Sequence, residues 1–289
     1  MEKSNLIRVL MILLLILSAL ICLRDVIDAF NEAKYANNED SKEYEEFDNI
    51  IEEEQLFYNG IKNKISDIKK EPYIFEGFKY LEGDINSGYV IEDQNENQYV
   101  WVPCNKYNLN KFYFCEDSFI DLKYCYDIEY KEFLNSVVEN GGFYISRFEI
   151  GNEEGKAVSK MSVPIWNNVN RKEAQEIISN MYENVNCELI NGYAYDATFK
   201  WLQNSSEYDI YEYDFKNSSS EIKCGRNKIN NIYDFTDNIF ELTIENDYDV
   251  CVVRGYFTDE KLYSRFAVDE NAREMNEVLK LGFRTIIYK

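Results

Sequence analysis

The spacing of hydrophobic residues changes several times along the chain, and each spacing predicts a different element. An unbroken apolar run covers Val9 to Leu23. A membrane-spanning helix needs about 17–25 residues, so this run is slightly short by itself. Leu6 and Ile7 extend this run, and Arg8 can lay its aliphatic stem along it while keeping its charge in water. The run therefore predicts a transmembrane anchor.

A cleaved signal peptide is the competing interpretation of this run. No cleavage pattern of small residues follows it directly, and Ile21 before Cys22 is too bulky for a lipoprotein site. Lys3 and Arg8 precede the run, and an acidic stretch follows it. Because positive charge stays on the cytoplasmic side, we expect residues 1–24 to form a single-pass anchor in the cell membrane. The N-terminus would be cytoplasmic and the rest of the chain extracytoplasmic.

A polar, acidic linker and one amphipathic helix are predicted after the anchor. Residues 25–46 are rich in acidic and amide side chains. From Phe47 to Ile68 the apolar positions follow helical spacing, and Pro72 ends the pattern. We expect this helix to pack on the next domain, with a dimerising stalk as the alternative. The predicted boundaries are 25–71 for linker and helix and 72–289 for the ectodomain.

Strands and helices then alternate. Period-two spacing predicts strands over 75–81 and 143–149, and a hairpin of 88–91 with 99–102 joined by the polar turn 93–97. Helical spacing predicts three helices, the first ended by a Gly-Gly stop and the second capped by an asparagine. These helices cover Ile128–Val138, Asn170–Tyr182 and about Tyr195–Leu202.

Composition excludes several classes of function. The chain has no histidine, so Ser–His–Asp and Cys–His nucleophiles, imidazole bases and imidazole-based zinc or iron sites are absent. A net charge of −22 repels nucleic acid, and no basic patch reverses that repulsion. We therefore expect no nucleic-acid partner. Solubility explains the acidic surface, and affinity for calcium is the sharper alternative.

Six cysteines follow the anchor, which permits up to three disulfides outside the cytoplasm, or free thiols. No CxxC spacing occurs, so structural zinc is not expected. Cys251 lies in an apolar stretch and is predicted to be a small buried hydrophobic residue. The six are Cys104, Cys115, Cys125, Cys187, Cys224 and Cys251.

Seven motifs occur in order after Pro72. They are Gly88-Tyr-Val-Ile91 with Tyr99-Val-Trp-Val-Pro103, Gly142–Glu149, Asn168–Ala174, Tyr195–Trp201, Asn231–Thr243, Arg254-Gly255 and Leu281-Gly-Phe-Arg284. In this order they resemble the formylglycine-generating enzyme (sulfatase-modifying factor) family, and more closely its bacterial members that often lack the catalytic apparatus. The resemblance covers roughly residues 72–289. It implies an α+β class and a compact, irregular C-type-lectin-like domain.

The resemblance also implies where copper would bind. The family's oxidase uses two cysteines after the Arg-Gly strand, and aligned on Ser264-Arg-Phe266 these positions fall on or near Thr258 and Tyr263. Neither is a thiolate, the ligand that selects Cu(I). The related iron-dependent sulfoxide synthases need three histidines. We therefore expect no copper and no enzyme activity; the alternative is an oxidase or related cofactor-dependent enzyme acting on exported proteins.

A structural calcium site is the metal site of the family that this sequence partly keeps. The family uses an Asn and a Glu of a Gly-Asn-x-Trp-Glu-Trp segment, and this chain has Asp237-Asn-Ile-Phe-Glu-Leu242. The resemblance implies calcium ligands at Asn238 and Glu241, with Asp237 and Asp234 as further hard oxygens. Loop hydrogen bonds by the same side chains are the alternative.

The loop at the family's active site is the predicted recognition surface, because this fold presents variable loops on a rigid scaffold. The arginines Arg147, Arg265 and Arg284 are expected to be framework residues. The sequence thus predicts a membrane-anchored, non-catalytic module that binds a surface glycan, peptide or protein, or forms part of an envelope assembly. A minor pilin is a further alternative, although no Gly-Phe-x-x-x-Glu signal occurs. The candidate binding residues are Tyr256, Thr258, Asp259, Tyr263 and Arg265.

Overall fold

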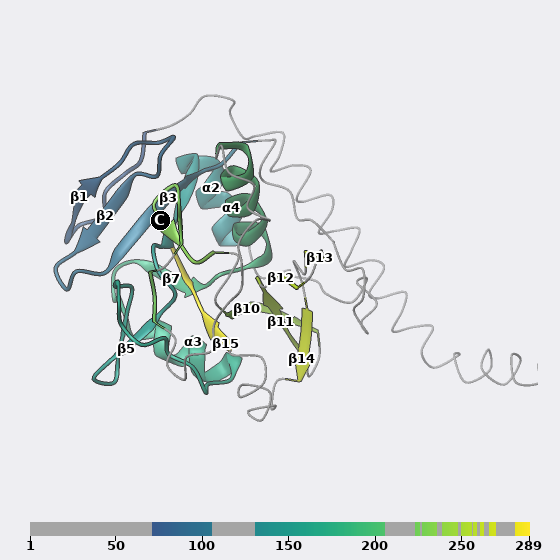
Figure 1. Cartoon of the computed structure of the whole chain (residues 1–289). Coiled ribbons are helices and arrows are strands. Elements are labelled where there is room, and N and C mark those ends of the chain that lie inside the picture. Colours follow the sequence, from purple (N-terminus) through teal and green to yellow (C-terminus); the bar gives the residue numbers. More distant parts are fainter. Residues whose placement is uncertain are drawn as a thin grey trace, which may run out of the picture. The chain divides into compact units, whose positions relative to one another are not determined.

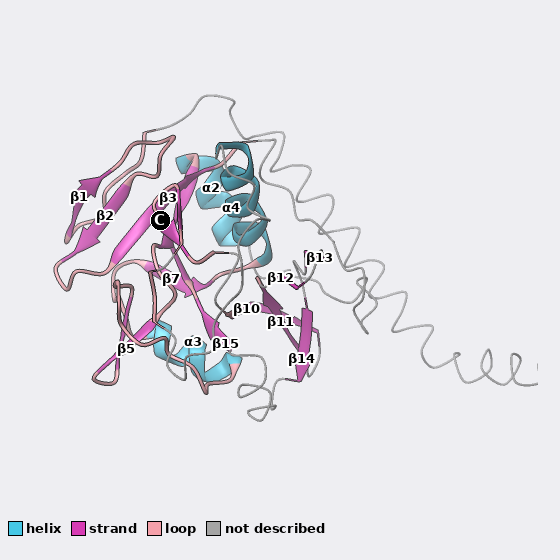
Figure 2. Cartoon of the chain, viewed as in Figure 1, coloured by secondary structure: helices cyan, strands magenta, loops and turns pink. Residues whose placement is uncertain are grey.

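In a computed structural model of the chain, the described residues form an α+β domain with more strands than helices (Figure 2). The predicted anchor at 9–23, the linker and the helix at 47–68 lie outside the described residues. Among those described, no helix is long and apolar enough to cross a membrane. The structure describes residues 71–105, 131–205, 223–225, 227–235, 239–247, 250–255, 257–258, 261–262, 266–269 and 281–289.

The larger sheet has six antiparallel strands in the order β1-β2-β3-β4-β16-β7. The last strand of the chain, β16, lies between β4 and β7, so the C-terminus reaches the middle of the domain (Figure 1). The strands are β1 (Phe78–Glu82), β2 (Val90–Asp93), β3 (Gln98–Pro103), β4 (Gly142–Ser146), β16 (Thr285–Tyr288) and β7 (Asn186–Leu189).

Both faces of the central strands β2, β3, β4 and β16 are buried, whereas the edge strand β1 is largely exposed. Alternate residues of a strand point to opposite faces, and Val102 and Trp101 accordingly join two different apolar clusters. The helices α2 (Lys131–Asn140) and α4 (Gly192–Ser205) cover the face of Val102. Aromatic residues of the segment 73–78 cover the face of Trp101. The strands therefore carry apolar residues on both sides.

A second sheet has the order β14-β11-β10-β15, in which β10 and β15 are parallel. Helix α3 (Arg171–Ser179) contacts β7 of the first sheet and β10 of the second, and thereby joins the two. The strands of the second sheet are β14 (Phe266–Asp269), β11 (Val250–Arg254), β10 (Phe240–Asp247) and β15 (Leu281–Phe283).

Three short two-stranded ladders complete the described domain. The hairpin β5–β6 turns through Glu154 and Gly155, whose φ angles of 54° and 81° fit the left-handed residues of a type I′ turn. The ladders are β5 (Gly151–Glu153) with β6 (Lys156–Val158), β8 (Lys228–Ile229) with β9 (Ile232–Tyr233), and β12 (Phe257–Thr258) with β13 (Lys261–Leu262).

The predicted hairpin is confirmed, and the helix boundaries differ for identifiable reasons. Asn170 caps α3 in a reciprocal capping box with Glu173. The helix stops at Ser179 instead of continuing to Tyr182, whose hydroxyl donates to Asp93 Oδ2 at 2.7 Å. Helix α4 begins three residues earlier than predicted, because Asn191 Oδ1 accepts the third helical N–H at 2.8 Å.

Candidate functional site

Three buried arginines from the sequence motifs hold the described domain together. Arg284, fully buried, donates through Nε to Glu241 Oε1 and through Nη2 to the carbonyl oxygen of Tyr233. Its Nη1 donates to the carbonyl oxygen of Ser146 at 3.2 Å, and its guanidinium lies 5.9 Å from the ring centre of Phe235. This one side chain therefore connects three motifs that are far apart in the sequence.

Arg254 forms a second buried centre. Its Nε donates to Glu245 Oε2 at 2.8 Å, and its Nη1 donates to Asp196 Oδ1 at 3.0 Å. The guanidinium also lies 5.2 Å from the ring centre of Tyr195. Burial alone lowers the pKa of Arg254, but the carboxylates of Asp196 and Glu245 raise it above its ordinary value. The arginine therefore stays charged, and its role is structural.

Arg147 links the first sheet to the β8–β9 ladder. Its Nη2 pairs with Glu82 Oε1 at 2.5 Å, and its Nε donates to the carbonyl oxygen of Asn231 at 3.1 Å. The guanidinium lies 5.4 Å from the ring centre of Tyr233. The prediction of a framework role is confirmed for Arg147 and Arg284, whereas Arg265 lies outside the described residues.

The structure describes two of the predicted calcium ligands, Asp234 and Glu241. Glu241 is 1 % exposed and pairs with Arg284, so a calcium ion bound there would lie beside a fixed positive charge. Asp234 accepts from the backbone N–H groups of Gly225 and Asn227, both at 2.7 Å. Both carboxylates therefore have protein partners in the arrangement seen.

Calcium binding by the whole segment stays a prediction, since Asp237 and Asn238 lie outside the described residues. Within the described ranges, no group of three or more acidic or cysteine side chains is placed to hold a metal ion. The two described acids of the segment instead serve an ion pair and loop hydrogen bonds, which is the alternative that the sequence left open.

The predicted binding loop is described only in part. Thr258 lies in β12, opposite Lys261 of β13. The chain leaves β11 through Gly255, whose φ of +85° is a left-handed conformation that suits glycine. The other four candidate residues, Tyr256, Asp259, Tyr263 and Arg265, lie outside the described residues.

The four described cysteines are free thiols, and they are Cys104, Cys187, Cys224 and Cys251. Burial raises the pKa of the Cys104, Cys187 and Cys224 thiols above their ordinary value, which keeps them protonated and unreactive. Cys251 is 2 % exposed, as predicted for a small buried hydrophobic residue. Cys115 and Cys125 lie outside the described residues.

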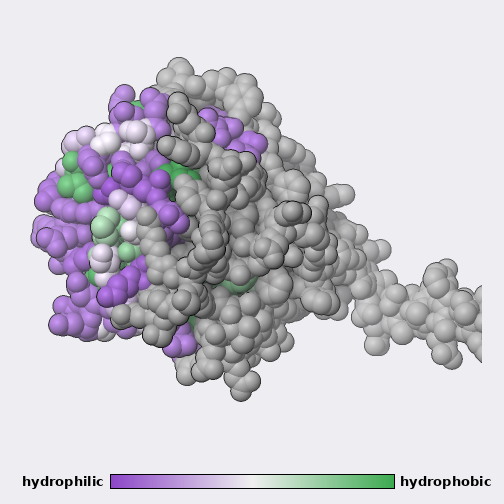
Figure 3. All heavy atoms as spheres, viewed as in Figure 1, coloured by the Kyte–Doolittle hydropathy of each residue, from purple (hydrophilic) through white to green (hydrophobic). Residues whose placement is uncertain are grey.

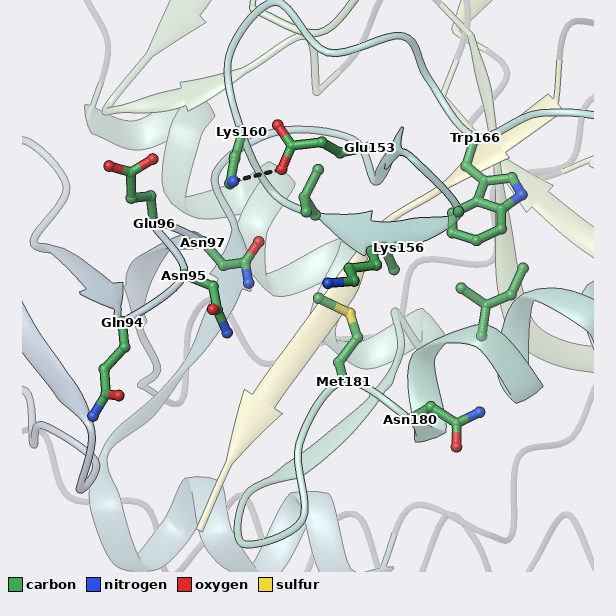
Figure 4. A pocket seen from close by; sticks show the side chains of 14 residues that line it. Gln94, Asn95, Glu96, Asn97, Glu153, Lys156, Lys160, Trp166, Asn180 and Met181 are labelled. Carbon is green, nitrogen blue, oxygen red and sulfur yellow. Dashed lines mark hydrogen bonds and ion pairs between the residues drawn. The ribbon is translucent and has the colours of Figure 1, made fainter.

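A pocket of about 760 Å³ opens on the described surface, at a place that the sequence did not indicate (Figure 4). Its walls are the turn 94–97 between β2 and β3, the β5–β6 hairpin with Lys160, and the end of α3 with Met181. Trp166 also lines it. We call this cavity the hairpin pocket. On the face that Figure 3 shows, the described surface is mostly hydrophilic, with small separate apolar patches.

The turn that forms one wall is held rigidly by Asp93, which is 6 % exposed. Asp93 accepts from the backbone N–H groups of Asn95 and Asn97 at 2.8 Å and from the Tyr182 hydroxyl at 2.7 Å. Asn97 in turn accepts from the backbone N–H of Ser159 at 2.9 Å. The turn is thus tied both to the segment after α3 and to the segment after β6.

Two lysines of the hairpin pocket differ in their electrostatic surroundings. Lys160 pairs with Glu153 at 2.7 Å. Lys156 is exposed and forms no ion pair with any described residue. Trp166 is half-buried against the apolar cluster under α3, and its backbone N–H donates to the carbonyl oxygen of Ile150 at 2.8 Å. The pocket therefore combines one available cation with a fixed aromatic ring.

No family model, curated protein or solved structure matches the chain. The geometry of the described residues therefore carries the functional argument.

Proposed function

We propose that the chain is a membrane-anchored, extracytoplasmic and non-catalytic C-type-lectin-like module of the sulfatase-modifying factor family, and that it binds a surface glycan, peptide or protein. The observation that carries this proposal is the use of the motif residues. Arg284 and Arg254 are fully buried and paired with carboxylates. Groups engaged in this way support a scaffold and take no part in chemistry on a substrate.

The arrangement of the motifs supports the family part of the proposal. The motif that ends at Glu149, the motif 231–243 and the motif that ends at Arg284 meet around one guanidinium. Residues separated by 138 positions, Ser146 and Arg284, are in direct contact. Such convergence is expected when separate motifs belong to one conserved type of framework, and it supports a C-type-lectin-like domain built on short strands.

The residues at the expected copper positions support the non-catalytic part. Thr258 provides a hydroxyl where the resemblance implies a thiolate, and Tyr263 provides a phenol. Of the described thiols, Cys251 is buried in β11. A rigid pocket and a loop between residues 256 and 265 remain as recognition surfaces, which suits a binding module that keeps the fold of an enzyme family.

The test is an oxidation assay on the full chain in detergent. The protein is incubated with Cu(I), oxygen and cysteine-containing peptides of exported proteins, and the peptides are examined by mass spectrometry. We expect unchanged peptides, because no thiolate pair is available at the expected positions. Conversion of a peptide cysteine to an aldehyde would establish the alternative, an oxidase acting on exported proteins.

A further inference from the structure

The hairpin pocket carries groups that recognise hydroxyl and acetamido groups. Asn95 is exposed on the turn wall, and its side chain makes no hydrogen bond with a described residue. Asn180 follows α3, lines the pocket and donates its amide nitrogen to the carbonyl oxygen of Glu176 at 2.7 Å, so its amide oxygen is the group left to accept a hydrogen bond from a ligand. An amide both donates and accepts hydrogen bonds, and this matches a ligand with many hydroxyl groups.

Lys156 adds a positive charge at the centre of this set. Figure 4 shows it extending from β6 into the pocket, between Asn95 of the turn and Met181, which follows the C-cap of α3. Glu153 is engaged by Lys160, and Glu96 points away from Lys156 in the same view. In a chain with a net charge of −22, an available ammonium inside a pocket favours an anionic group of the ligand.

Trp166 supplies an apolar surface beside these polar groups. Part of its ring packs on the cluster under α3, so the ring is held in place before any ligand arrives. The face of an indole carries negative charge density, which attracts the C–H bonds on one side of a sugar ring. Met181 is flexible and polarizable and can adapt to the same ligand.

The size of the pocket favours a small ligand. Its volume of about 760 Å³ lies in the range of roughly 300–1,000 Å³ that is usual for small-molecule sites. A protein partner would instead need a complementary interface of at least about 1,000 Å² of buried surface. A short saccharide segment fits these dimensions.

We propose that the hairpin pocket binds an acidic saccharide, with the carboxylate at Lys156, hydroxyl groups at Asn95 and Asn180, and one ring face on Trp166. This inference rests on the proposed function as a binding module and names its ligand class. An acidic peptide shares the carboxylate but lacks the ring of hydroxyl groups, so the test includes it as a competing ligand.

The test is a calorimetric titration of the full chain, in a detergent without sugar head groups, with uronic-acid oligosaccharides. The carboxyl-reduced, neutral oligosaccharides and an acidic peptide are titrated in parallel. We expect binding of the uronic acids and about tenfold or greater weakening in Lys156→Gln, because a charge-assisted hydrogen bond is lost. Trp166→Ala removes the ring surface and should weaken both the acidic and the neutral oligosaccharides.

Lys172→Gln is the matched control, since Lys172 is an exposed lysine in the first turn of α3 and does not line the pocket. It should bind like the wild type, and unchanged melting temperatures should verify that each variant is folded. The inference is overturned if the wild type does not bind the uronic acids, if Lys156→Gln binds them equally well, or if the acidic peptide binds more tightly. These titrations test only the ligand of the pocket. The non-catalytic proposed function is tested separately by the peptide oxidation assay, whose readout is an aldehyde.

Discussion

At the residue scale, the domain depends on charges that are removed from water. Burying a guanidinium costs several kcal/mol, and only close carboxylates and further hydrogen-bond acceptors offset that cost. Arg284 has Glu241 together with two backbone carbonyls, and Arg254 has Glu245 and Asp196. Removing one carboxylate therefore leaves a buried positive charge with too few partners.

Glu241→Gln should lower the free energy of unfolding by about 3–5 kcal/mol, because Arg284 then remains charged and buried. Chemical denaturation followed by circular dichroism measures this change. The control is Glu153→Gln, which breaks an exposed pair with Lys160 and should cost about 0–1 kcal/mol. Equal small effects in both variants would show that the Arg284 pair does not hold the core.

The partner of Glu241 also shows what a sequence can and cannot indicate about single residues. Arg147 and Arg284 were predicted from the sequence as framework residues, but the partner of Arg284 was not predicted. The pairing of Glu241 with Arg284 spans 43 positions, and no local pattern reveals it. For this reason the prediction of Glu241 as a calcium ligand took no account of its ion pair with Arg284, and calcium binding by the segment stays a prediction.

At the element scale, caps and close approaches decide where helices end. The Asn170 cap of α3 and the Gly-Gly stop after α2 were predicted from the sequence, whereas the reciprocal bond of Glu173 was not. Asn191, which caps α4, was overlooked although an asparagine before a helix is a known signal. The premature end of α3 was not predictable, because Tyr182 is drawn to Asp93 of a distant turn.

Asn170→Ala should destabilise the domain by about 1 kcal/mol. The N–H of Glu173 loses its acceptor, Asn170 Oδ1, and the Glu173 side chain that accepts from the N–H of residue 170 is held less firmly. Thermal unfolding measures the effect. Asn135→Ala is the control, because Asn135 is an exposed residue in the interior of α2. Alanine is the better helix former there, so this variant should be neutral or slightly stabilising. A loss of stability in Asn135→Ala equal to that in Asn170→Ala would contradict the capping role.

The hairpin pocket combines elements that local patterns treat separately. The turn 94–97, the hairpin around Lys156 and the end of α3 were each open to prediction as polar segments. These segments lie together because Asp93 accepts a hydrogen bond from Tyr182 and Asn97 accepts one from Ser159. The two donors are 89 and 62 positions away along the chain. The sequence signal for this pocket is Trp166, a single indole within a polar, Asn-rich stretch.

At the scale of the whole molecule, both faces of the central strands of the larger sheet are buried, and many phenols and thiols are buried with them. Burial raises the pKa of Tyr99, Tyr195 and Cys104 above their ordinary values, which are 10.0 for tyrosine and 9.0 for cysteine. The folded chain therefore holds these protons more tightly than the unfolded chain. This stability is fully present below the unfolded-state pKa and is lost as pH rises above it.

We expect the melting temperature to fall above about pH 9, where the cysteines and then the tyrosines of the unfolded chain begin to ionise. Scanning calorimetry across alkaline pH measures this change, and ultraviolet absorbance reports tyrosinate in the same samples. The buried tyrosines should ionise together with unfolding. Their ionisation in a chain that stays folded would mean that water reaches the core.

We propose that the chain keeps the framework of the formylglycine-generating enzyme family without its copper chemistry. Copper analysis of the full chain after Cu(I) loading and desalting is the sharpest test of this proposal. We predict far less than one copper per chain, because Thr258 and Tyr263 stand at the expected thiolate positions. One tightly held copper per chain, with the absorption of copper–thiolate bonds, would contradict the account and identify an oxidase.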